Sequence, residues 1–93
     1  MAYAGYIMDD KELLKILKAV ANENRFRIVK CLLEHKDFSV GDLAEDLNLP
    51  FRTVSRDLFS LRRVNLVQVR NHFSERLYSI NVKNFPKSLL ELF

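Results

Sequence analysis

The sequence predicts a mainly α-helical fold that contains a small β-hairpin near its C-terminal end. Apolar residues recur at helical spacing up to about Val64, and after Asn65 their period shortens from about 3.6 residues to 2. The 93 residues leave room for one domain, 1–93, and 48% hydrophobic with 29% charged residues is typical of a folded chain. We therefore expect four helices, a hairpin and a final helix in a single domain.

Two helices are expected first. Asp9 and Glu12 have the spacing of a capping box, and the apolar residues after them predict a helix over about 10–21. The run 22–24 consists of residues that prefer caps and turns, so it interrupts the helical pattern. A second helix with one broad apolar face then ends near Glu34.

A pair of shorter helices follows. Ser39 and Asp42 form another capping-box pattern, which begins a helix with a single apolar stripe. The run 48–50 ends this helix, because its proline disfavours helical dihedral angles in the residue before it. The next helix extends to about Val64. Its inward-facing residues are expected to be Phe51, Val54, Leu58 and Leu61.

The hairpin is expected directly after Asn65, which tolerates the left-handed conformation at a helix end. The segments 66–70 and 76–80 alternate like strands, and 71–75 would form a five-residue turn between them. After a break near Pro86, the segment 87–93 predicts a short apolar helix.

This order of elements predicts a winged helix-turn-helix. The helix-turn-helix would occupy 39–64, the wing 66–80, and the outer helices 9–21 and 85–93 would mediate dimerisation. In this fold the second of the two short helices lies in the major groove of DNA. That makes the helix after Pro50 the candidate recognition helix.

Charge is distributed unevenly along the chain. Residues 1–49 hold seven Lys/Arg and nine Asp/Glu, a net charge of −2, whereas 50–93 hold eight and three, a net charge of +5. Every basic residue between Pro50 and Val82 is an arginine, whose planar donor fork suits phosphate groups and guanine edges. The pattern favours an anionic partner for the second half of the chain. The alternative is that these charges only form a solvated surface of mixed charge.

The face of the recognition helix opposite Val54, Leu58 and Leu61 is strongly basic. At 100° per residue this face carries Arg52, Arg56, Phe59 and Arg63. Because the N-terminal part of a recognition helix meets base edges, we assign base readout to its first residues. The residues assigned to base readout are Arg52, Thr53, Ser55 and Arg56.

Phosphate or wing contacts are assigned to residues further along the chain. They are Arg63, Arg70, His72 and Arg76. The wing arginines would grip phosphate or enter the adjacent minor groove, the alternative being that they only keep a strand edge soluble. Phe59 would touch a thymine methyl group or a protein partner, unless it packs under the hairpin.

Four stretches of the chain carry a familiar pattern. They read NENRFRIV at 22–29, SVGDLA at 39–44, TVSRDLFSL at 53–61 and LYSI at 77–80. In these stretches, and over about 13–80 as a whole, the chain resembles the ArsR-type winged-helix regulators. The stretch at 53–61 is fairly specific for this kind of recognition helix, and related winged-helix families share it.

The resemblance implies a homodimeric transcriptional repressor that contacts DNA through the recognition helix and wing and releases it when an effector binds. Metal-sensing members carry a Cys–x–Cys pair at the positions where this chain has Ser-Val-Gly, 39–41. A second metal site of that family uses histidine on the last helix, and the segment 87–93 has no histidine. We therefore expect no metal site of the family. Asp57 stands where many members have histidine, and Pro50 replaces a usual polar cap.

Other chemistry finds little support in the sequence. Cys31 and His35 are spaced i, i+4, but two ligands leave a zinc site incomplete, and a core cysteine is the common alternative. The chain has two glycines and no phosphate-binding glycine loop, and its carboxylates are expected at helix caps or facing solvent. We expect no enzyme activity, no cofactor and no metal.

These observations together predict a homodimeric, sequence-specific regulator of double-stranded DNA, most simply a repressor that reads a palindromic operator. A protein-interaction module and a non-specific architectural DNA-binding protein are the alternatives. With one cysteine and no apolar run near 18 residues, the chain is expected to be cytoplasmic, associated with the nucleoid when bound to DNA, and not a membrane protein.

The expected dimer seam joins the first and last helices. Its residues are Leu13, Leu17, Leu89, Leu92 and Phe93. Further apolar residues near the N-terminus are Tyr3, Tyr6, Ile7 and Met8. These apolar residues exceed what the core of one protomer of this size needs, so an interface between two protomers would bury them. The alternative is that they pack within the core of their own protomer.

Overall fold

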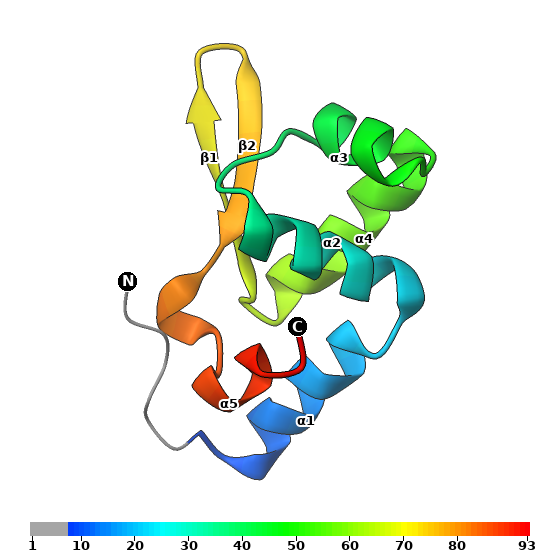
Figure 1. The fold of residues 1–93 in the computed structure, drawn as a ribbon. Helices are drawn as coiled ribbons and strands as arrows, with labels where there is room; N and C mark the ends of the chain where they lie inside the picture. The colour runs from blue at the N-terminus through cyan, green and yellow to red at the C-terminus, as the bar shows by residue number, and fades with distance from the viewer. Residues whose placement is uncertain (1–7) are drawn as a thin grey trace.

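The computed structural model describes residues 8–93 and shows four helices, an antiparallel hairpin and a short C-terminal helix (Figure 1). The elements are α1 (Asp10–Val20), α2 (Glu23–Glu34), α3 (Val40–Leu47), α4 (Phe51–Arg63), β1 (Val67–His72), β2 (Glu75–Ile80), η1 (Val82–Asn84) and α5 (Lys87–Leu90). This arrangement confirms the predicted winged helix-turn-helix. Within residues 8–93, no helix has the length and apolar character needed to span a membrane.

Side-chain caps begin the first three helices where the sequence predicts them. The Asp9 carboxylate accepts the backbone N–H of Glu12 at 2.8 Å, and Asn22 caps α2 in the same way. At α3 the capping box is complete: the Ser39 hydroxyl accepts the N–H of Asp42 at 3.1 Å, and the Asp42 carboxylate accepts the N–H of Ser39 at 3.3 Å. These bonds satisfy backbone donors that the first turn of a helix leaves free.

The turn between α3 and α4 is tight. Asn48 ends α3 in the left-handed conformation with φ of 53°, and Pro50 is the extended residue from which α4 begins. Arg27 in α2 stabilises this end of α3, because its Nη2 donates a hydrogen bond to the Leu47 carbonyl oxygen at 2.7 Å. The carbonyl groups in the last turn of a helix need such partners from outside.

The core forms around α4, which contacts α1, α2, α3 and β1. Val54, Leu58 and Leu61 are completely buried, as predicted. Phe51 is not inward as expected, since 61% of its surface is exposed. It is the first residue of the helix, and its ring shares a hollow with outward-facing residues of α4 because the body does not extend beneath that turn.

The hairpin is longer and its turn tighter than the sequence suggested. Asn71 and His72 continue β1 and pair with Arg76 and Glu75 of β2. The predicted five-residue turn is therefore wrong, and two residues, 73–74, connect the strands. The pairing of 71–72 with 75–76 is made by backbone groups, which is why polar side chains there gave no indication of strand.

The segment before α3 is part of the same sheet region. Phe38 forms a bridge with Tyr78 of β2, with N–H to carbonyl distances of 3.0 Å and 2.7 Å in the two directions. The sequence predicts only a connector here. The bridge fastens the base of the wing to the chain that leads into the helix-turn-helix.

The C-terminal region differs most from the prediction. A single 3₁₀ turn, η1, precedes α5, and α5 covers four residues instead of the predicted 87–93. After α5 the chain continues in turns, with the N–H of Leu92 bonded to the Leu89 carbonyl at 3.0 Å. The Phe93 ring stacks on Phe26 of α2 with centroids 4.7 Å apart. Figure 1 shows α1 and α5 at the end of the molecule opposite the hairpin tip.

Asn65 confirms the predicted left-handed residue between α4 and β1. Its φ is 60°, and its carbonyl oxygen accepts hydrogen bonds from the side-chain amides of Asn81 at 3.1 Å and Asn84 at 3.0 Å. Asparagine tolerates this conformation better than residues with a larger apolar or branched side chain. The turn thus joins the end of α4 to the segment after the wing.

Replacing Asn65 by alanine is expected to lower the free energy of unfolding by about 1 kcal/mol, because alanine at positive φ places Cβ against the following carbonyl. Asn65→Gly removes the same side chain without that conflict, so its loss should stay below about 0.5 kcal/mol. Urea unfolding followed by circular dichroism measures both. Equal losses in the two variants would show that the side chain, and not the backbone conformation, matters here.

Candidate nucleic-acid interface

The outward face of α4 carries the residues assigned to base readout. Arg52, Ser55 and Arg56 are exposed, and Thr53 is half-buried at the edge of the same face. They belong to the first two turns of the helix, on the side opposite the completely buried Val54. The fold therefore gathers the four side chains at one end of α4, and their contact with bases stays a prediction.

Two exposed aromatic rings flank these arginines. Phe51 and Phe59 are each 61% exposed and line a shallow hollow together with Arg52, Ser55 and Arg56. Phe59 therefore does not pack under the hairpin, which removes that alternative. Sequence reasoning missed Phe51 at this surface, because helical spacing placed it with the core residues and gave no sign that the core ends before the first turn.

A carboxylate lies beneath the same helix, where none was expected. Asp57 is 3% exposed, so the expectation that the carboxylates cap helices or face solvent is wrong for this residue. Its Oδ1 lies 3.5 Å from Nη1 of Arg25 in α2 and 4.0 Å from Nε of the adjacent Arg56. Two guanidinium groups close to one carboxylate offset part of the cost of burying that charge.

Arg25 has a second partner that holds it in place. Its Nε donates a hydrogen bond at 2.5 Å to the carbonyl oxygen of Ala19, near the end of α1. The other oxygen of Asp57, Oδ2, is buried and has no hydrogen-bond partner among residues 8–93. The side chain of Arg25 thus connects α1, α2 and α4 at one point behind the recognition helix.

The far end of α4 meets a second group of cations. Lys15 and Lys18 of α1, Arg25 of α2 and Arg63 of α4 line one hollow together with Ser60. No carboxylate contributes to its lining, although Glu12 lines a neighbouring hollow that includes the same Lys15 and Arg63. The sequence showed the lysines, but it did not show that α1 runs beside the end of α4.

The wing places its three assigned residues on the surface. Arg70, His72 and Arg76 are all exposed. Arg70 is not free, however, because its Nη2 forms an ion pair with Asp37 at 3.2 Å. The Arg76 guanidinium carbon lies 6.0 Å from the centre of the Tyr78 ring, within the range of a cation–π contact.

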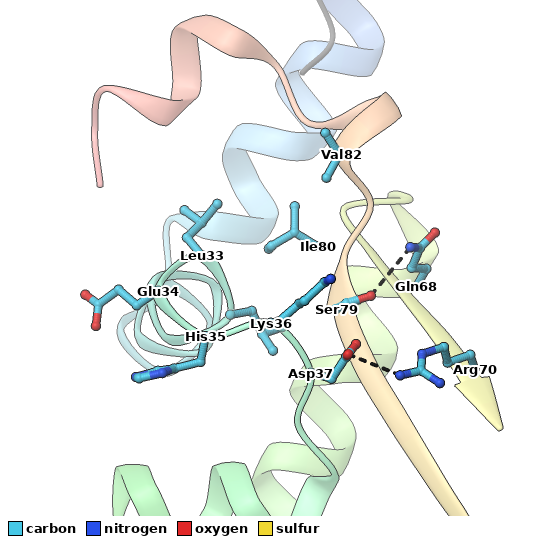
Figure 2. Close-up of a pocket in the computed structure, with 11 residues that line it drawn as sticks. Leu33, Glu34, His35, Lys36, Asp37, Gln68, Arg70, Ser79, Ile80 and Val82 are labelled. Atoms are coloured by element: carbon cyan, nitrogen blue, oxygen red, sulfur yellow. Dashed lines mark hydrogen bonds and ion pairs between the residues drawn. The ribbon is translucent and has the colours of Figure 1, made fainter. Parts of the chain in front are cut away.

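A cavity of about 550 Å³ lies where the base of the wing meets the end of α2 (Figure 2). Apolar side chains such as Leu33, Ile80 and Val82 line it on one side, and the Asp37–Arg70 ion pair lies at its edge. In Figure 2 the Lys36 side chain extends toward β2, whereas Glu34 and His35 point to the opposite side. The ion pair and the cavity therefore belong to the same junction between wing and body.

Comparison with known proteins identifies the family. The model of the bacterial regulatory proteins of the arsR family matches residues 22–69. The chain belongs to the arsR family. This is a family of transcription regulators and not a class of enzymes, and the winged helix-turn-helix described above is its DNA-binding fold.

Relatives extend the match beyond the helix-turn-helix. The chain is 36% identical over 77 residues to the transcriptional activator HlyU of Vibrio cholerae, covering 83% of this chain and 69% of HlyU. A structure of HlyU from Vibrio cholerae N16961 matches with a TM-score of 0.77 and 33% identity over 91% of this chain and 92% of that one.

Two further arsR-like structures are also similar. The transcriptional repressor BigR from Xylella fastidiosa has a TM-score of 0.68 and 28% identity, covering 75% of this chain and 68% of BigR. The homodimeric winged helix-turn-helix DNA-binding domain Mb0332 from Mycobacterium bovis has a TM-score of 0.71 and 24% identity, covering 80% of this chain and 73% of that domain. At that identity the second likeness shows the fold alone.

Cys31, the single cysteine of this arsR-family protein, is buried in α2. Burial raises the pKa of its thiol to about 12, and the thiol donates a hydrogen bond to Oδ2 of Asp46 at 3.4 Å, which acts in the same direction. His35 is exposed and stacks on Phe38, with centroids 5.4 Å apart. Across residues 8–93 no three His, Cys, Asp or Glu side chains are grouped as metal ligands would be.

The predicted dimer seam is only partly on the surface of the protomer. Leu17 and Leu92 are exposed, and Leu13 and Phe93 are half-buried. Leu89 is 3% exposed and belongs to the protomer's own core, so its assignment to the seam is corrected. The short α5 turns that side chain inward.

The remaining apolar candidates fall in three different places. Leu14, which the prediction left out, is exposed beside Leu17 on α1. Met8 is half-buried against the core, and Tyr3, Tyr6 and Ile7 lie outside the described residues. The exposed apolar surface of the described chain in this region therefore comes mainly from α1 and from Leu92.

The raised pKa of Cys31 predicts an unreactive thiol. An unfolded thiol titrates near 9.0, so at pH 8 the folded chain should react with iodoacetamide at least about a hundredfold more slowly than the urea-unfolded chain. Because folding raises this pKa, the proton is held more tightly in the folded state. The resulting stability is complete below pH 9.0 and is lost as the pH rises toward about 12.

Mass spectrometry of the labelled protein measures this rate. Asp46→Asn removes a carboxylate that adds to the effect of burial in raising the pKa and should speed labelling, whereas Glu45→Gln, at the neighbouring acid of α3 that does not raise this pKa, should not. Equal labelling rates for the folded and unfolded wild-type chains would contradict the prediction.

Proposed function

We propose that this protein is a homodimeric transcriptional repressor that reads a palindromic operator with α4 and the wing. The observation that carries the proposal is the division of α4 into two faces. One face is completely buried, and the opposite one presents Arg52, Arg56 and Arg63 to solvent. Arginines spaced i, i+4 repel each other on a free helix, and the phosphates and base acceptors of a major groove relieve that repulsion.

Base readout is proposed for the first two turns of α4, through Arg52, Thr53, Ser55 and Arg56. The exposed rings of Phe51 and Phe59 supply apolar surface for thymine methyl groups beside these donors. Arg63 lies about 16 Å from Arg52 along the helix and is better placed for phosphate. The cationic hollow that it shares with Lys15 and Lys18 supports this division.

Dimerisation is proposed through α1 and the C-terminal segment. Leu14 and Leu17 of α1 and Leu92, which follows α5, are exposed. Figure 1 shows α1 and α5 at the end of the molecule away from the hairpin tip. Two protomers joined there would present one α4 each to half-sites about one helical turn of DNA apart. The homodimeric Mb0332 domain, which has the same fold, supports a dimer.

Repression is proposed because a dimer of this size on a promoter excludes other proteins from the DNA it covers. Of the relatives, BigR is a repressor and HlyU is an activator. The position of the operator relative to the promoter would decide whether a bound dimer represses or activates transcription. The protein would act in the cytoplasm, on chromosomal DNA.

Arginine substitutions on α4 separate base contacts from phosphate contacts. Arg52→Ala or Arg56→Ala should cost about 1–3 kcal/mol on the preferred duplex and relax preference at one base position. Arg63→Ala should weaken binding to all sequences alike and reduce the salt slope by about one unit. Lys30→Ala, an exposed lysine of α2 outside these surfaces, is the matched control and should change neither.

The measurement begins with selection from a randomised duplex pool at physiological salt, followed by fluorescence anisotropy on the enriched duplex. An enriched inverted repeat is the expected result. Retention of DNA without any enrichment would point to an architectural protein, and no retention at all would point to a protein-interaction module. Equal effects of the three arginine substitutions on every sequence would contradict the assignment of base readers.

The seam predicts a second effect, on oligomeric state. Leu17→Glu introduces a charge into an apolar interface, so the variant should sediment as a monomer at micromolar concentration while its helical circular dichroism is unchanged. The wild-type chain and Lys30→Ala should sediment as dimers. A monomeric wild-type chain in the absence of DNA would contradict the preformed dimer.

A further inference from the structure

The tip of the wing presents a bare aromatic ring. Phe73 is 94% exposed, more than any other large apolar side chain among residues 8–93. Figure 1 shows the hairpin projecting past the helices, with its tip far from α1 and α5. The ring contributes nothing to the core, and its contact is an edge-on one with the neighbouring His72 at 4.7 Å.

The backbone at this position is unfavourable for phenylalanine. Phe73 has a φ of 57°, a conformation that glycine, asparagine and aspartate adopt far more readily in two-residue hairpin turns. A glycine would make the same turn with less strain and without exposing a ring to water. A strained residue with an exposed apolar side chain at the end of a projecting hairpin indicates a role in contact with a partner.

The surroundings of the ring favour a polyanion as that partner. Arg70 and Arg76 lie on the two strands just behind the tip, and every residue from 70 to 76 is exposed. Glu75 is the one acid in this stretch and pairs across the strands with His72. An apolar protein groove would not call for arginines around the ring, whereas DNA phosphates do.

Duplex DNA also has a place for such a ring. Proteins that bind the minor groove insert apolar side chains, phenylalanine among them, between base pairs and bend the duplex by unstacking one step. With α4 in the major groove, a hairpin beside it reaches the adjacent minor groove, where the two arginines would meet the phosphates on either side. The ring would then point toward the bases.

We propose that Phe73 is a wedge that enters the minor groove of each half-site and unstacks one base step. The inference rests on the proposed DNA-binding function and adds to it a form of sequence preference that needs no hydrogen bond to a base. Pyrimidine–purine steps such as TA and CA unstack most easily, so one of them is expected under each wing tip. The operator is bent at these two steps.

The test uses the full chain and the duplex that it enriches from a randomised pool. 2-Aminopurine, whose fluorescence rises when it loses its stacking neighbours, replaces one adenine at a time along that duplex, and dyes at the two ends report bending by energy transfer. For the wild-type chain we expect a several-fold rise in fluorescence at one step per half-site, together with a shorter distance between the ends.

Three variants separate the ring from the turn. Phe73→Gly keeps the positive φ and should melt at the same or a higher Tm, yet it should abolish the fluorescence rise and the bend and weaken binding about tenfold without changing the salt slope. Phe73→Leu keeps an apolar wedge and should restore part of both signals. Ser74→Ala is the matched control at the other turn position and should behave as wild type.

Each failure has its own meaning. If the wild-type chain binds the enriched duplex with no rise at any position, or if Phe73→Gly gives the same rise as wild type, the wedge is wrong and the DNA-binding proposal stands. If the wild-type chain enriches and binds no duplex, the proposed function fails and the wedge fails with it.

Discussion

The burial of one face of α4 is the constraint on which the remaining structure depends. Val54, Leu58 and Leu61 are completely buried where α4 meets α1, α2, α3 and β1, so each of those elements takes its position from this helix. Burying such a side chain stabilises the fold by about 1.5–3 kcal/mol, whereas a like-charged i, i+4 pair on the outward face costs about 0.2–0.5 kcal/mol. The core therefore fixes the helix firmly enough to hold a row of arginines in solvent.

Two arginines of α2 connect the helix-turn-helix to this core by polar contacts. Arg27 donates to the carbonyl group at the end of α3, and Arg25 meets the buried Asp57 of α4. Both helices of the motif are thus held by one neighbouring helix, at positions two residues apart. Oδ1 of Asp57 also lies 4.0 Å from Nε of Arg56. The carboxylate that pairs with Arg25 behind α4 therefore also attracts the guanidinium group of a residue proposed to read bases.

Helix caps and turns could be predicted from the sequence because they depend on neighbouring residues. Burial and ion pairs could not, because they depend on contacts between distant parts of the chain. The capping residues Asp9 and Ser39 and the left-handed Asn65 lie where the sequence predicts them, because each acts within about three residues of itself. Phe51 and Leu89 were placed wrongly, since their burial depends on where neighbouring elements end. Asp57 was missed because its partner Arg25 is 32 residues away.

The wing combines a base that is joined to the body with a tip that projects into solvent. At the base, the Phe38–Tyr78 bridge and the Asp37–Arg70 ion pair join the hairpin to the segment that leads into α3. The cavity in Figure 2 opens at the same junction. If the wing binds DNA as proposed, phosphate would compete with Asp37 for Arg70, and the contact would then reach the connector between α2 and the helix-turn-helix.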